Sequence, residues 1–230
     1  SSSTAGVYYL KDSVDNLLNA GGTIVSGAHR AGSTNIVIED TFANLHTNGG
    51  ISSIKLAFSD VDLDIVVTDG ITKAQYDLIN NNNGTGTITY SISDVKTAFL
   101  DGASSTTLLT ASSGTSASPK AVLDAATNVT ITNTITDNQS LAIQTSRTAA
   151  SKNVSTFTFD ISDTAAGIFG DSGGANAVDN TALMAQATSI SITTAVNSAQ
   201  VLSLNTARSG LSGVTFAAIT DTAGNLGGQS

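Results

Sequence analysis

The segment FDISDTAAGI, residues 159–168, contains the pattern that decides the fold. Phe159 and Ile161 alternate with polar residues, which is the two-residue period of a strand with one buried face. Asp163 ends the alternation, and a short helical turn follows. A side-chain oxygen at this position can accept hydrogen bonds from the first backbone N–H groups of the turn, which otherwise lack partners. The segment therefore predicts a strand that ends at a capping aspartate and continues into a short helix.

Segments of the same kind recur along the whole chain. The Asp, Asn or Thr at the end of each predicted strand is called the junction residue below, and successive junction residues are 25 to 31 residues apart, with one spacing of 39. Such regularity predicts a repeat protein, because one strand–helix repeat cannot bury its apolar face without neighbours. The junction residues, which we expect to be structural caps, are Asp12, Asp40, Asp69, Asp94, Asn133, Asp163, Thr194 and Asp221.

The repeats alternate between two kinds. In the first kind an apolar residue stands five positions after the junction residue, as Leu45 does after Asp40. In the second kind a β-branched residue stands two positions after the junction residue and Gln stands six positions after it. These pairs are Ile71 with Gln75, Ile135 with Gln139, and Val196 with Gln200. The alternation indicates duplication of a module made of two repeats.

Composition and repeat length together predict the fold class. The chain is 40% hydrophobic but only 5% aromatic, without Trp, and this suits thin layers that pack on their neighbours. We expect a mainly β fold, an elongated solenoid-like stack of strand-plus-short-helix repeats of about 28 residues, with β-sandwich repeats as the alternative. Residues 1–230 are expected to form a single repeat domain of about eight repeats, with a surface excursion at 102–120 and a frayed tail at 224–230.

Charge and cysteine content exclude several kinds of partner and site. Nine Lys and Arg against eighteen Asp and Glu give a net charge of −9, which disfavours nucleic acid. The absence of cysteine excludes disulfides and thiolate metal sites. No apolar run approaches the ~18 residues that a membrane span needs.

The motif GDSGG, residues 170–174, matches the nucleophile segment of trypsin-like serine proteases. Ser172 would attack the substrate, His29 would accept its proton and Asp64 would orient the imidazole. The motif directly follows a repeat, however, where Gly, Ser and Asp are expected on turn chemistry alone. We favour the turn interpretation and assign no catalytic residue.

A group of aspartates in FSDVDLDIVV, residues 58–67, is the candidate metal site. Alternate residues of a strand share a face, so three carboxylates would lie side by side and could bind calcium, which prefers oxygen ligands. The alternative is a charged strand surface that prevents wrong strand pairing. The candidate calcium ligands are Asp60, Asp62, Asp64 and Asp69.

Threonines at alternate strand positions suggest a binding surface. Two hydroxyls on one strand face could bind a crystalline polysaccharide or ice, although Thr is also a good polar strand former. The pairs are Thr87 with Thr89, Thr130 with Thr132, and Thr156 with Thr158.

The recurring I(S/T)D segments, at 92–94, 161–163 and 219–221, alternate with Gln-bearing repeats. Together they resemble the repeats of very large, acidic, cysteine-free, Ser/Thr/Ala-rich surface proteins of Gram-negative bacteria and cyanobacteria, including surface-layer and adhesin-like types. The resemblance implies export, residence at the cell surface, self-association and often calcium, and it identifies no catalytic residue.

We therefore expect a non-catalytic extracellular structural protein, a subunit of a surface layer, filament or adhesin stalk whose partner is itself. The alternative is a glycan- or ice-binding module, and a remote alternative is a secreted hydrolase. Assembly would depend on calcium or protein concentration, a binding module would stay monomeric, and an enzyme would lose activity on one substitution without losing its fold.

Overall fold

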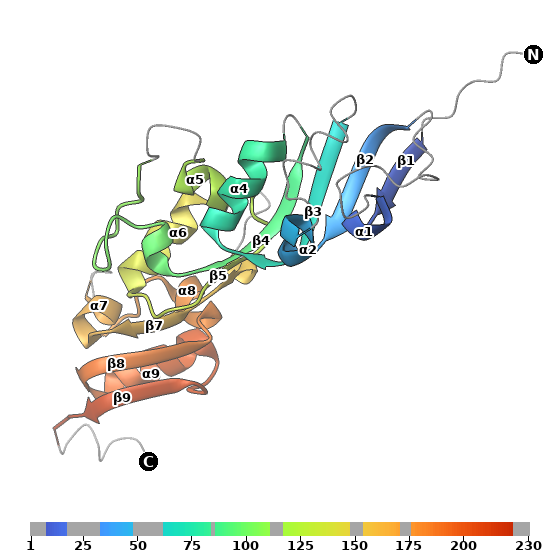
Figure 1. Ribbon diagram of the computed structural model, residues 1–230. Coiled ribbons are helices and arrows are strands. Elements are labelled where there is room, and N and C mark those ends of the chain that lie inside the picture. The colour runs from blue at the N-terminus through green and yellow to red at the C-terminus, as the bar shows by residue number, and fades with distance from the viewer. Residues whose placement is uncertain are drawn as a thin grey trace, which may run out of the picture. The chain divides into compact units, whose positions relative to one another are not determined.

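The computed structural model describes residues 8–17, 33–47, 62–83, 86–110, 117–147, 154–170 and 176–222 (Figure 1). The chain divides into two compact lobes. The first lobe contains residues 1–93 and 111–127, and the second contains residues 94–110 and 128–230. In each lobe strands alternate with helices along the chain.

The first lobe is a parallel sheet whose strands follow one another in chain order. The strands are β1 (Tyr8–Asp12), β2 (Ser33–Asp40), β3 (Asp62–Ile71) and β4 (Ile88–Asp94), and each pairs in parallel with the next. The helices are α1 (Val14–Leu17), α2 (Phe42–Thr47), α4 (Lys73–Asn83) and α5 (Pro119–Ala125).

Only one face of this sheet is fully covered. Ile36 and Ile38 of β2 and Ile65 of β3 are fully buried, whereas Val37 and Val66, which alternate with them, are partly exposed. Ile38 and Ile65 are paired across the two strands, so buried residues meet on the same face. The helices that connect the strands therefore pack on that face, and the alternate side chains of β2 and β3 are partly exposed on the opposite face.

The second lobe contains two short groups of parallel strands. Strand β5 (Val129–Ile131) pairs with β6 (Phe157–Thr158), and β8 (Ser189–Val196) lies between β7 (Asp160–Asp163) and β9 (Val214–Ile219). Its core includes Phe157 and Phe159, whose ring centroids are 4.3 Å apart. The helices are η1 (Lys96–Ala98), α6 (Asp137–Ser146), η2 (Val154–Thr156), α7 (Ala165–Phe169), α8 (Thr181–Gln186) and α9 (Ser198–Arg208).

The expected mainly β, solenoid-like stack is wrong, and so is its β-sandwich alternative. The chain is α/β, with parallel strands alternating with helices, and more of the described residues are helical than extended. The error comes from the second kind of repeat, in which α4, α6 and α9 have 11, 10 and 11 residues. These helices are rich in Asn, Gln, Ser and Thr, and α9 buries only Leu204, so their apolar stripe is too weak to be recognised.

Irregular strand pairing precedes two of the three long helices, α4 and α9. The register shifts between Val66 and Gly70 of β3, and between Ile192 and Ala195 of β8. Extra residues in one strand of a pair form a bulge. Each strand then continues past its junction residue, and the long helix begins four residues after it, at Lys73 in the case of α4.

The expected surface excursion, residues 102–120, ends in a helix. The only proline of the chain is the first residue of α5, and the Ser118 hydroxyl accepts a hydrogen bond from Ala121 N at 3.2 Å. Residues 111–116 of this segment, and the expected frayed tail at 224–230, lie outside the described residues. Among the described helices the longest have 11 residues, and none is long and apolar enough to span a membrane.

Candidate functional site

The junction residues form the most regular polar arrangement in the chain, and Asp40 shows their role. Its Oδ1 accepts hydrogen bonds from Thr41 N at 2.8 Å and from Asn44 Nδ2 at 2.7 Å, so this oxygen caps the turn of its own repeat. Its Oδ2 accepts a hydrogen bond from Val14 N at 3.0 Å, which belongs to the preceding repeat. Asp40 is only 8% exposed, so one buried carboxylate links two repeats through its hydrogen bonds.

Five further helices show the same contact between repeats. In each, the backbone N–H of the first helical residue donates to the junction side chain of the following repeat. These bonds join Phe42 N to Asp69 Oδ1 (2.8 Å), Lys96 N to Asn133 Oδ1 (2.9 Å), Asp137 N to Asp163 Oδ2 (2.9 Å), Ala165 N to Thr194 Oγ1 (2.8 Å) and Ser198 N to Asp221 Oδ2 (2.9 Å). We call this arrangement the junction row.

The helix that each junction residue caps differs from the sequence-based expectation. We expected each junction residue to cap the helix that follows it in its own repeat. In the structure, its side chain instead accepts the first N–H of the helix of the preceding repeat. The third N–H of a helix is capped by another residue, which directly precedes the helix. These N-cap residues include Thr41, Thr72, Thr136, Thr164 and Asn197.

The recurring Gln of the second kind of repeat completes a capping box. Gln139 N donates to Thr136 Oγ1 at 3.2 Å, and Thr136 N donates back to Gln139 Oε1 at 3.1 Å. Gln75 with Thr72 and Gln200 with Asn197 show the same reciprocal pair. The sequence signal for it, Thr or Asn followed by Gln three residues later, was present but was not interpreted as a cap.

A second recurring group was missed by the sequence analysis. The residue fourteen positions after Asp69, Asn133 and Thr194 is the last residue of the long helix or the one that follows it. Its side chain donates to a carbonyl of the segment just before the next strand. The bonds are Asn83 Nδ2 to Gly86 O (2.7 Å), Arg147 Nη2 to Thr156 O (3.3 Å) and Arg208 Nη2 to Ser212 O (3.1 Å). Burial lowers the pKa of Arg208.

The candidate calcium ligands are not brought together by the described part of the chain. Asp64 Oδ1 accepts hydrogen bonds from Thr87 N and Thr87 Oγ1, both at 2.7 Å, and Asp69 belongs to the junction row. Asp60 and the side chain of Asp62 lie outside the described residues. Among the described residues no group of three or more His, Cys, Asp or Glu side chains could hold a metal ion.

The protease-like motif lies mostly outside the described residues. Gly170 directly follows α7 as its C-cap, whereas Ser172 and His29 are not described. Asp64, the third member of that hypothetical triad, has its Oδ1 occupied by Thr87.

An open hollow of about 330 Å³ lies between α6 and α8 in the second lobe. Asn180, in a left-handed conformation with φ of 39°, donates from Nδ2 to Asp137 Oδ2 at 2.6 Å beneath it. Gln144 accepts a hydrogen bond from Arg147 Nη1 at 3.1 Å. The first of these bonds joins the N-cap of α8 to α6, whereas the second lies within the C-terminal turn of α6. The lining residues are Leu141, Gln144, Asn180, Thr181, Ala182 and Leu183.

Replacing Asp40 by Ala tests the junction row. Asp40→Ala removes three hydrogen bonds to a buried carboxylate, and we expect the free energy of unfolding in urea to fall by about 2–3 kcal/mol. Hydrogen exchange at the Val14 amide should accelerate, because its acceptor belongs to the other repeat.

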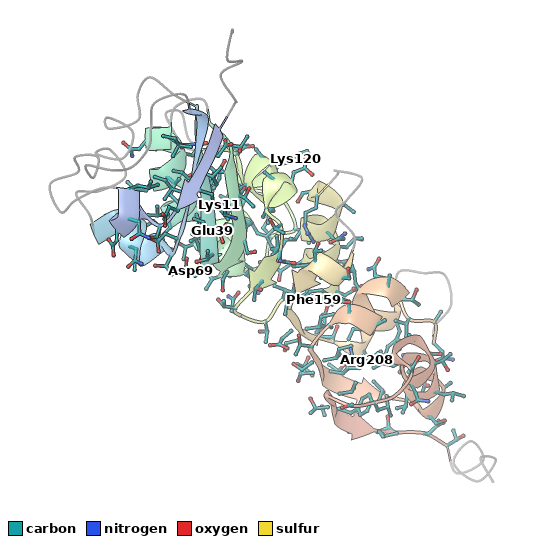
Figure 2. All side chains as sticks on the ribbon, turned by 90° about the vertical axis from the view of Figure 1, so that its right-hand side faces the viewer. Lys11, Glu39, Asp69, Lys120, Phe159 and Arg208 are labelled. Carbon is teal, nitrogen blue, oxygen red and sulfur yellow. The ribbon has the colours of Figure 1, made fainter. Side chains whose placement is uncertain are left out.

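The matched control is Glu39→Ala. Glu39 forms a surface ion pair with Lys11 (Figure 2), and we expect its loss to cost less than about 1 kcal/mol. Equal effects of the two substitutions would contradict the role of the row.

The carboxyl of Asp12 gives a pH-dependent test. Hydrogen bonds from the Asn16 side chain and from Ser13 N hold the pKa of Asp12 below its ordinary value of 3.8. Both bonds favour the charged form, so their stabilising effect is present above pH 3.8 and is lost as the pH falls through the lowered pKa. In Asn16→Ala we expect an NMR titration of the Asp12 carboxyl carbon to show a higher pKa. An unchanged pKa would show that the Asn16 contact is absent in solution.

No protein-family model matches the chain, and no curated protein or solved structure matches it either. Function is therefore inferred from the junction row and from the surfaces of the two lobes.

Proposed function

We propose that this chain is a non-catalytic structural protein of a bacterial cell surface, which assembles with copies of itself into a layer, filament or adhesin stalk. The observation that carries the proposal is the junction row. Every described contact of the row takes the first N–H of one helix to a side chain of the next repeat. A protein built by one recurring contact can be extended by the same contact, within a chain or between chains.

The hydrogen bonding of the junction carboxylates also favours a structural role. Each Asp with a described contact in the junction row accepts the first backbone N–H of the preceding helix, so one of its oxygens is engaged in a helix cap. A general acid or base would instead need to lie within reach of a substrate.

Composition supports a location outside the cell. Only 12% of the residues are charged, there is no cysteine, and the polar surface comes mainly from Ser, Thr and Asn. Such a surface forms hydrogen bonds with neighbouring chains or with glycans without a strong repulsive field. Calcium stays part of the proposal as an ion that could join acidic surfaces.

Light scattering of the purified chain at several concentrations tests the proposal. We expect the average mass to rise above 23.1 kDa as protein is added, and the rise to be steeper with millimolar calcium than with chelator. Magnesium at equal ionic strength is the control, because it separates specific calcium binding from screening. A monomer at every concentration in all three solutions would contradict self-assembly.

A second candidate function, glycan binding, is favoured by one feature of the second lobe. Ser162, Ser191 and Thr215 are paired across β7, β8 and β9, and all three have some exposure. They therefore form a row of hydroxyls, at least partly exposed, across one face of these three strands, at the ~4.8 Å spacing of neighbouring strands.

Retention on an insoluble polysaccharide such as chitin or cellulose tests this candidate. If the hydroxyl row binds the glycan, the double variant Ser191→Ala, Thr215→Ala should bind about tenfold more weakly, since each hydrogen bond contributes ~1 kcal/mol. The control is Thr145→Ala, which removes an exposed hydroxyl from α6. Equal retention of both variants would exclude the row as the binding surface.

A further inference from the structure

The first lobe holds two tyrosine rings in contact. Tyr76 of α4 and Tyr90 of β4 have ring centroids 4.5 Å apart, with 40° between the ring planes. Tyr90 is 1% exposed, and its hydroxyl donates a hydrogen bond to Val122 O of α5 at 2.8 Å. Tyr76 is partly exposed, and its hydroxyl donates to Asn80 Oδ1 at 3.3 Å. One ring of the pair is therefore fixed in the core, and the other can be reached from solvent.

The two phenol groups act on each other and are surrounded by negative charge. Burial raises the pKa of Tyr90, and the neighbouring phenol of Tyr76 raises it further. The carboxylates of Asp124 and Asp77 act on Tyr90 in the same direction. Negative charge beside a phenol opposes the loss of its proton, but it favours the loss of an electron from the ring. Oxidation of this pair can therefore remove an electron together with a proton.

The composition of the chain directs oxidation to tyrosine. Cysteine and methionine are the side chains that oxidants commonly attack, but the chain has no Cys and its single methionine, Met184, is 0% exposed. It has no Trp and four Tyr. Among the described side chains, Tyr76 and Tyr90 form the one contact between two tyrosine rings. A radical formed at Tyr76 thus has a second phenol beside it with which to react.

We propose that Tyr76 and Tyr90 are a modification site, at which a small one-electron oxidant joins the two rings by a carbon–carbon bond. The oxidant takes one electron from Tyr76, whose hydroxyl proton passes to solvent. Tyr90 gives an electron and a proton to Tyr76, and a second oxidant molecule then oxidises Tyr76 again. The two ring radicals couple at carbons beside their hydroxyl groups, and the hydrogen of each carbon moves to the phenol oxygen. In total the oxidant gains two electrons, the solvent gains two protons and the protein loses two hydrogen atoms.

The bond would tie the first long helix, α4, to the sheet at β4. A covalent link of this kind stabilises a fold mainly by restricting the unfolded chain. A chain without cysteine cannot obtain such a link from a disulfide, so the tyrosine pair would supply it in another way. The inference goes beyond the proposed function and does not depend on self-assembly.

Oxidation of the folded protein by azide radicals, a small one-electron oxidant, tests the inference. Proteolytic cleavage before Asp77 separates Tyr76 from Tyr90, so the two fragments stay joined only if the rings are linked. In monomeric protein we expect mass spectrometry to find these fragments joined, with the mass of two hydrogen atoms missing. In urea, where the fold no longer holds the rings together, the yield should fall at least about tenfold.

Two sets of Tyr→Phe substitutions serve as a matched pair. Tyr76→Phe keeps the ring but removes the hydroxyl from which the first radical forms, so it should give no joined fragments. Its circular dichroism should match that of the wild type, because the hydrogen bond to Asn80 that it loses is exposed. The double variant Tyr8→Phe, Tyr9→Phe removes the other two tyrosines of the chain and should give the wild-type yield.

Three results would overturn the inference. They are joined fragments in Tyr76→Phe, complete separation of the wild-type fragments after oxidation, and equal yields in urea and in buffer. The last result would show that the contact of the folded rings has no part in the coupling. None of these results bears on self-assembly, because the link is measured within a single chain.

Discussion

The hydrogen bond on which the structure depends is the one from the first N–H of a helix to a side chain of the next repeat. Isolated helices of three to eleven residues are not stable in water, because their terminal N–H groups, which lack partners within the helix, are a large fraction of all their backbone donors. The junction row satisfies one of these donors in each of six helices. Folding of one repeat therefore depends on the presence of the following repeat.

The chemistry of this contact explains which residues the junction positions tolerate. The contact needs one oxygen acceptor at the end of a strand, and Asp163, Asn133 and Thr194 all supply one. Asp has a second oxygen and can cap its own turn as well, as Asp40 does. In both kinds of repeat a Thr or Asn directly before the helix caps its third N–H, as Thr164 and Thr136 do, so a single acceptor at the junction is sufficient for the first N–H.

The sequence predicted the ends of four strands, but not the other strand ends, the long helices or the direction of capping. Strands β1, β2, β4 and β7 end at the expected junction residues, because the strand period and a capping side chain are both local signals. Helix α4 reads KAQYDLINNNN and was missed, since its burial depends on tertiary contacts and not on a clear apolar stripe. The contact from Asp40 to Val14 spans 26 residues, and no local pattern indicates which repeat an aspartate caps. The hypothetical calcium group was inferred from strand alternation alone, and the pairing of Asp64 with Thr87 depends on a neighbouring strand.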